Sequence, residues 1–328
     1  FESKSMAIIK PTQAPPTYST LPMAAFTVGS QAYHDIYVRL GDNHYVKILK
    51  QGDIFDESIF KNYREKGVTH FHIHKSNQLH YATELSFGTT KIIRNPSVSF
   101  ETKVAEVTRQ GIVTAEFLKT TPNLGPEEAQ FALGYVKNTF TLADEIKAKT
   151  EGKNIDSYLK SAAQSEHIVS VTSFSAILAR KLGFETEKSA QIIGLAAVFH
   201  DVALFQKNPE LISMREADMT PEQKQTYYDH PTEGAKILSA IPNIDPTVPQ
   251  IVANHHRRRD GTGFPKQVDA ATPQNMKLAE IVGICEAYFD FVSGFKDDKN
   301  FKIKIEMAVF GGFSPEVADQ LRPLISIV

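Results

Sequence analysis

The sequence predicts an all-helical bundle in the C-terminal part of the chain, preceded by a small α+β domain. Short strand-like runs are confined to about the first 90 residues. Asn95-Pro96 interrupts the pattern, and long stretches with helical periodicity follow without strand-like alternation. We therefore expect a small α+β domain over residues 1–95, linking helices over 96–150 and a helical domain over 151–328.

The N-terminal domain is expected to contain four strands and one helix. Residues 1–22 carry four prolines and predict an extended lead-in. A hairpin turn is expected at residues 41–43, and Gly67 is expected to end the helix. The predicted strands are 24–28, 35–40, 45–49 and 68–74, and the helix is 58–66. The position of this domain suggests a sensory or protein-contact role by analogy only.

The remaining chain predicts long helices. Pro126 stands at a first-turn position, where proline is tolerated. In the helix expected at 161–182, Ile168, Val171 and Phe174 fall on one face and predict a buried side. The expected helices are 101–120, 127–149, 161–182, 187–205, 231–240, 246–256, 275–292 and 301–310.

Composition narrows the function. The chain has 328 residues, of which 41% are hydrophobic and 23% charged, and this length suggests about two domains. The net charge of −2 gives no overall positive field that would attract duplex nucleic acid. A single cysteine, Cys285, excludes an internal disulfide and fits a reducing compartment. No apolar run approaches the roughly 20 residues of a membrane span, so a cytoplasmic location is expected.

Two unlike groups stand out among the 11 histidines. In the first, His70, His72 and His74 alternate with Phe71 and Ile73, so a strand places the three imidazoles on one face. Three such imidazoles can bind zinc or copper, but catalytic zinc usually recruits ligands from across a fold. The preferred interpretation is a solvated strand face opposite a buried one.

The second group is spread through the predicted helices, at positions that face a core. One buried histidine is usually a hydrogen-bonded core residue, but several without partners would be costly. A shared metal removes this cost, and imidazole with carboxylate suits zinc, iron or manganese. The candidate metal ligands are His167, His200, Asp201, His230, His255, His256 and Glu286. Asp201 has two oxygens and can bridge two metals.

A run of arginines follows this group directly. Arg257, Arg258 and Arg259 beside a metal cluster suit a phosphate-bearing ligand. The alternative is an exposed basic helix end that complements the helix dipole. Gly261 and Gly263 then permit a tight turn with close backbone approach.

Taken in order, these segments resemble the HD-GYP family of the HD phosphohydrolase superfamily, from about residue 155 to about residue 320. His167 is similar to the histidine of the family's first core helix, and His200-Asp201 to its HD doublet. Glu286 stands where the family usually has a metal-binding aspartate. The other matching segments are His230-Pro231, His255-His256 with residues 260–265, and residues 313–317.

The resemblance implies an HD-type helical bundle with two or three metals, often iron, that hydrolyses cyclic di-GMP. Manganese and zinc are the alternative metals. By this resemblance Asp201 is the catalytic bridging ligand, and a water between the metals provides the hydroxide that attacks phosphorus. Arg258, Arg259 and Lys266 would orient the phosphates. One metal would take His167, His200, Asp201 and Glu286, and the other His230, His255 and His256.

Several positions depart from the family pattern. Leu204 replaces a lysine, Phe264 replaces the signature tyrosine, and Arg257 replaces a glutamate. Ala163 stands where members with three metals carry a glutamate, which favours a two-metal centre. The family's Arg-Pro-Tyr-Arg segment is absent from residues 293–297.

Three functions therefore stay open. The first is a metal-dependent phosphodiesterase acting on cyclic di-GMP. The second is a non-catalytic or weakly active signalling module that binds a cyclic dinucleotide or a partner protein and keeps a binuclear metal centre. The third is a hydrolase for another phosphoester. The long helices over 101–149 are candidates for passing a signal or for pairing in a homodimer.

Overall fold

The structure is a computed structural model that describes residues 18–42, 44–121, 123–148, 153–266, 272–295 and 300–325. The chain divides into two compact units, residues 1–78 and residues 79–328, which are described separately. Most of the predicted extended lead-in, residues 1–17, lies outside the described residues.

The first unit is a four-stranded antiparallel sheet with the strand order β1-β4-β2-β3. Asp56 caps the helix through the backbone N–H of Ile59, at 3.0 Å. The elements are β1 (Tyr18–Pro22), η1 (Met23–Ala25), β2 (Ile36–Gly41), β3 (His44–Leu49), α1 (Glu57–Glu65), β4 (His70–His74) and η2 (Lys75–Asn77). The strand predicted at 24–28 is wrong, because the first strand pairs with β4 earlier, from Tyr18 to Pro22.

The alternation in β4 is confirmed, but the solvated histidine face is only partly so. Phe71 and Ile73 are fully buried. On the opposite face His70 is exposed, whereas His72 is 6% exposed. His72 lies 3.2 Å from the Thr20 hydroxyl and under the ring of Tyr45. Burial lowers the pKa of His72 to about 4, so this imidazole is neutral near pH 7.

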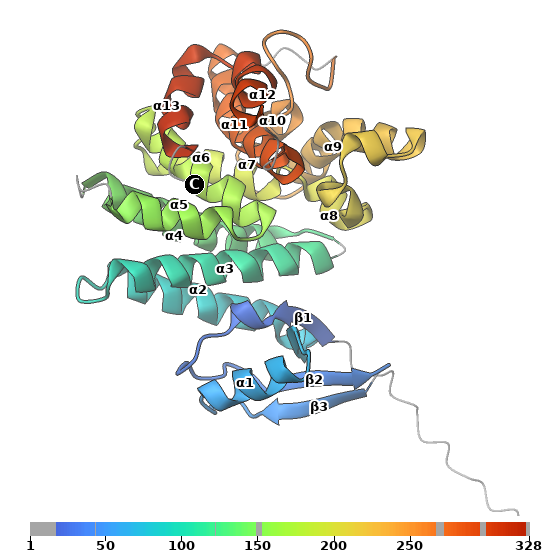
Figure 1. Cartoon of the computed structure of the whole chain (residues 1–328). Helices are drawn as coiled ribbons and strands as arrows, with labels where there is room; N and C mark the ends of the chain where they lie inside the picture. Colours follow the sequence, from blue (N-terminus) through green and yellow to red (C-terminus); the bar gives the residue numbers. More distant parts are fainter. Residues whose placement is uncertain are drawn as a thin grey trace, which may run out of the picture. The chain divides into compact units, whose positions relative to one another are not determined.

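The second unit is all-helical, which confirms the predicted fold class. Its elements are α2 (Gln78–Arg94), α3 (Phe100–Thr120), α4 (Pro126–Ala148), α5 (Lys153–Ala163), α6 (His167–Lys181), α7 (Glu187–Phe199), α8 (Val202–Lys207), η3 (Pro209–Ser213), η4 (Glu216–Asp218), α9 (Pro221–Ser239), α10 (Thr247–Asn254), α11 (Pro273–Phe295), α12 (Phe301–Ala308), η5 (Phe310–Gly312) and α13 (Pro315–Ile325). Figure 1 shows α6 and α7 between the α4–α5 side and the α10–α11 side of this unit.

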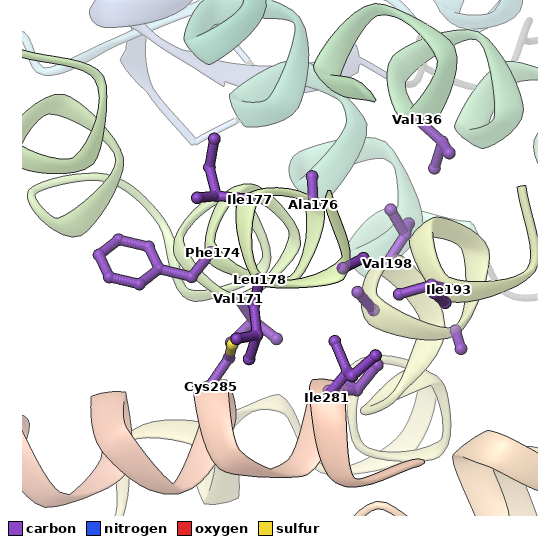
Figure 2. Packing of buried hydrophobic residues seen from close by; sticks show 14 of the residues in the cluster. Val136, Val171, Phe174, Ala176, Ile177, Leu178, Ile193, Val198, Ile281 and Cys285 are labelled. Carbon is purple, nitrogen blue, oxygen red and sulfur yellow. The ribbon is translucent and has the colours of Figure 1, made fainter. Parts of the chain in front are cut away.

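The core of this unit is built around α6. Figure 2 shows Val171 and Leu178 on the side of α6 towards Cys285 of α11, with Ile177 on another side. All four side chains are at most 3% exposed. The stretch Glu187–Lys207 is long and apolar enough to cross a membrane by length and composition, but 83% of its 18-residue apolar window is buried inside the fold. This stretch consists of the core helix α7 followed by α8.

Three helix predictions were wrong in their bounds, and one of them is the helix expected at 187–205, which is divided into α7 and α8 at His200-Asp201. The helix expected at 161–182 is two helices, α5 and α6, so that His167 begins α6. The helix expected at 231–240 begins ten residues earlier, at Pro221, where Thr220 and Gln223 form a capping box. Helices α2 and α13 were not predicted at all. The α9 correction matters most, because it moves His230 from a helix start to a helix interior.

Candidate metal centre

Helix ends and one proline orient the histidines of this centre. The Nδ1 atoms of His200 and His255 donate to the carbonyls of Ala197 and Val252, at 2.7 and 2.6 Å. Both carbonyls lie in the last turn of a helix, α7 or α10, where they have no donor from the helix itself. A carbonyl only accepts, so in each ring Nδ1 carries a proton, and Nε2 is the nitrogen left to bind a metal.

His230 reaches the same state by a different route. Its Nδ1 donates to the Tyr227 carbonyl at 2.6 Å, within α9. In an uninterrupted helix that carbonyl would accept from residue 231, but Pro231 has no N–H. The His-Pro pair therefore frees the acceptor that fixes the histidine tautomer. Such a hydrogen bond from the second ring nitrogen is typical of metal-binding histidines.

The seven predicted ligands converge. Two groups have ligand atoms within 4.8 Å of one another: His167, His200, Asp201 and Glu286 in one, and His230, His255 and His256 in the other. Six of these residues are at most 4% exposed, and the side chain of His167 is 21% exposed. The structure thus brings together residues that are up to 119 positions apart in the chain.

The Asp201 carboxylate lies between the two groups. Its Oδ2 is 3.4 Å from His200 Nε2 and 3.8 Å from His167 Nε2. Its Oδ1 is 3.2 Å from His230 Nε2, in the other group. Each oxygen therefore faces a different set of imidazoles, which is the arrangement a bridging carboxylate requires.

Glu286 also touches both groups. Its oxygens are nearest to His255 and His256, at 3.1 and 2.9 Å, although it clusters with the first group by the 4.8 Å criterion. Its geometry suits a ligand to either of two adjacent ions. The resemblance assigns it to the first ion, with His167, His200 and Asp201.

The electrostatics of the cluster favour bound cations. Despite burial, nearby histidines hold the pKa values of Asp201 and Glu286 well below the usual range, so both carboxylates are ionised. Burial opposes charge on His200 too, but Asp201 and Glu286 raise its pKa to about 10. Burial lowers the pKa of His256 to about 3. The cluster thus places ionised carboxylates among imidazoles in a buried site.

The polar atoms of the cluster are arranged to bind metal ions better than to hydrogen-bond with one another. His230 Nε2 and His255 Nε2 lie 3.3 Å apart, and with protons on both Nδ1 atoms these are two lone pairs facing each other. Among the described residues, Asp201 Oδ1, His256 Nε2 and Glu286 Oε2 are buried without an aligned hydrogen-bond partner. Such atoms are costly unless a cation satisfies them. The donor set of imidazoles and carboxylates suits iron, manganese or zinc.

A cavity of about 610 Å³ opens beside this cluster. Asp201, His256 and Glu286 contribute to its wall, so the two groups are accessible from it. The remaining wall comes from the segment 211–217, from α9 and from the helices α11 and α12. A volume of this size lies within the usual range for small-molecule sites, about 300–1,000 Å³.

The three basic residues predicted to contact substrate have different positions. Arg258 lines the cavity, with its guanidinium 4.3 Å from the centre of the Phe313 ring. Arg259 instead pairs with the buried Glu280 at 2.6 Å. Lys266 is exposed and donates to the Gly261 carbonyl. Arg259 and Lys266 are not among the described residues that line the cavity, so the substrate role predicted for them finds no support in this geometry.

Two cavity residues were missed from the sequence. Lys224 and Tyr227 lie six and three residues before His230 on α9 and line the cavity. The predicted helix began at Pro231, so neither was placed near the site. The capping box at Thr220 and Gln223 was the available signal, because it marks a helix start that puts these residues and His230 on one helix.

Comparisons with known proteins identify an HD domain in this part of the chain. A family model for the HD domain matches residues 144–274. Over 122 residues the chain is 29% identical to the cyclic di-GMP phosphodiesterase PA4108 of Pseudomonas aeruginosa, covering 37% of this chain and 28% of that protein. Over 113 residues it is 27% identical to the cyclic di-GMP phosphodiesterase response regulator RpfG of Xanthomonas campestris, covering 34% of this chain and 29% of that protein. Both matches span well under two thirds of these relatives.

The fold has a solved counterpart. The structure of Bd1817, described as a HDG"Y"P protein from Bdellovibrio bacteriovorus, superposes with a TM-score of 0.70. The match covers 94% of this chain and 100% of Bd1817, at 20% identity. The chain thus contains an HD domain with the fold of Bd1817. By these matches residues 144–274 are similar to HD domains, including those of two cyclic di-GMP phosphodiesterases.

One glycine sets the distance between α11 and the histidine pair. A Cβ atom on Gly283 would lie 2.0 Å from the His255 carbonyl oxygen, which is backbone and cannot move aside easily. We expect Gly283→Ala to push α11 outwards and displace Glu286, three residues on. The expected result is a lower metal content after dialysis against a chelator and a loss of about 1–3 kcal/mol in the free energy of unfolding.

Gly311→Ala is the matched control, because a Cβ atom there meets only the Glu306 carbonyl oxygen, at 3.5 Å. Metal analysis by mass spectrometry and urea unfolding measure the two effects. Equal metal retention by the two variants would contradict the role given to Gly283.

Proposed function

We propose that the chain is a metal-dependent phosphodiesterase of HD-GYP type that acts on cyclic di-GMP. The observation that carries the proposal is the carboxylate of Asp201, whose two oxygens face two separate groups of histidines at the wall of a cavity. The named activity of PA4108 and RpfG supports the choice of cyclic di-GMP.

The proposed ligands follow the two groups. His167, His200, Asp201 and Glu286 would hold one divalent cation, and His230, His255 and His256 the other, with Asp201 between them. Iron is the proposed metal, with manganese and zinc as alternatives. Two such cations would supply an activated water and neutralise the charge that develops on the phosphoryl group.

Cations of the chain would hold the phosphates. Arg258 and Lys224 line the cavity, and neither has a carboxylate within ion-pair distance among the described residues. Arg215 also lines the cavity but pairs with Asp218 at 2.7 Å. A buried or half-buried cation without an acidic partner is poised for an anionic ligand. Two of them, on different elements, suit a ligand with two phosphodiester groups.

One observation favours the alternative of a non-catalytic or weakly active signalling module. Leu204 is 1% exposed and packs with Leu211 and Met219, so this position offers no proton donor beside Asp201. In that case the chain would bind a cyclic dinucleotide or a partner protein and keep its metals. Binding with and without turnover separates the two candidates.

The metal assignment predicts a partial loss of metal on removal of one ligand. We expect His230→Ala to retain about one metal per chain instead of two, because the second group keeps only His255 and His256. His70→Ala, which removes an exposed histidine of the first unit, serves as the control. Mass spectrometry gives the metal-to-protein ratio. Full two-metal occupancy in His230→Ala would contradict the assignment.

Turnover tests the function itself. Iron- or manganese-loaded protein is expected to hydrolyse cyclic di-GMP, and Asp201→Ala is expected to reduce the rate by about 100-fold or more. Chromatography of the nucleotide products measures both. Tight binding of cyclic di-GMP without turnover would favour the signalling module, and the absence of both would point to another phosphoester.

The role of Lys224 predicts an effect on binding. We expect Lys224→Gln to raise KM for cyclic di-GMP by about 10-fold with a small change in kcat, since it removes a charge-assisted contact to a phosphate. Lys236→Gln is the control on the same helix, because Lys236 is exposed and pairs with Glu233 at 2.7 Å. An unchanged KM in Lys224→Gln would rule out the contact.

A further inference from the structure

Tyr227 occupies a fixed position against the candidate metal centre. Its ring centre is 5.3 Å from that of His230, 5.6 Å from that of His256 and 5.4 Å from that of Phe264. Its own carbonyl accepts the Nδ1 proton of His230. The residue is thus held at both its backbone and its ring, which leaves its hydroxyl little freedom to move away.

The hydroxyl of Tyr227 is available to a ligand. Tyr227 lines the cavity beside Asp201, His256 and Glu286. Among the described residues the hydroxyl has no hydrogen-bond partner, and it is not a fully buried atom. Tyr228, the next residue, differs in both respects: it does not line the cavity, and its hydroxyl donates to Glu216.

The ring of Tyr227 packs in part against side chains that cannot donate a hydrogen bond. One side of Tyr227 packs against the apolar cluster of Leu204, Leu211 and Met219. Phe264 stacks on His256 on the other side, with ring centres 4.2 Å apart. Neither Leu204 nor Phe264 can donate a hydrogen bond. The Tyr227 hydroxyl is therefore a polar group in a mainly apolar part of the cavity wall, next to the candidate metal ligands.

A phosphodiester at the metal ligands needs donors for oxygens that do not face the metals. Arg258 and Lys224 provide charge, but long side chains lose entropy when they are fixed. A tyrosine wedged between rings is already fixed, so its hydrogen bond costs little further order. We infer that Tyr227 is a substrate-contacting residue, whose hydroxyl donates a hydrogen bond to a non-bridging oxygen of the phosphodiester held beside Asp201.

This inference rests on the proposed phosphodiesterase function and is tested with Tyr227→Phe, which keeps the ring and removes the hydroxyl. We expect kcat for cyclic di-GMP to fall by about 10- to 100-fold, the size of a lost hydrogen bond to a charged group. Metal content should match that of the unaltered protein. Tyr228→Phe is the matched control and is expected to keep kcat within about 2-fold.

A second readout is independent of turnover. Inorganic phosphate binding to the metal-loaded proteins is measured by calorimetry, and Tyr227→Phe is expected to weaken it by about 10-fold. If the unaltered protein turns over no cyclic di-GMP, the proposed function fails, and phosphate affinity alone then decides the inference. Equal kcat and equal phosphate affinity in Tyr227→Phe and Tyr228→Phe would overturn it.

Discussion

Three hydrogen bonds from imidazole Nδ1 atoms to backbone carbonyls determine which ring nitrogens face the candidate metal centre. They fix His200, His230 and His255 with a proton on Nδ1 and with Nε2 turned towards the candidate metal centre. Because the three Nε2 atoms then converge with the Asp201 and Glu286 carboxylates, a buried region is left rich in lone pairs and poor in donors. Bound cations relieve that repulsion, and the same cations would activate water.

Two helix ends and one proline leave the acceptors of these bonds free. Helices α7 and α10 end at the centre, where their last carbonyls are free, and Pro231 frees the Tyr227 carbonyl inside α9. Gly283 then lets α11 approach the His255 backbone and brings Glu286 to the histidines. The close packing of α6 against α7 and α11 holds these helix ends in register, so the core and the centre depend on each other.

The family resemblance and the geometry differ over which residues around the candidate metal centre would contact a substrate. Arg259, which lies three residues after His256 in the sequence, forms an ion pair with Glu280 of α11. Lys224 and Tyr227, which carry no sequence signature, form part of the cavity wall. The proposed substrate contacts thus come from α9 and from Arg258. The candidate metal ligands match the family pattern except at Glu286, whereas the residues proposed to touch the substrate depend on the particular packing of this chain.

The sequence by itself determined the helical class and the seven candidate ligands, because buried polar residues on apolar helix faces need a common partner. It also predicted the alternation of Phe71 and Ile73 in β4. Tertiary structure decided where helices begin and end. The start of α9 at the Thr220 cap and the break before His167 do not coincide with changes in the helical periodicity of the sequence. It also decided that Asp201 faces both histidine groups and that Tyr227 lies beside them. Those are contacts between segments distant in the chain, and local patterns carry no information about them.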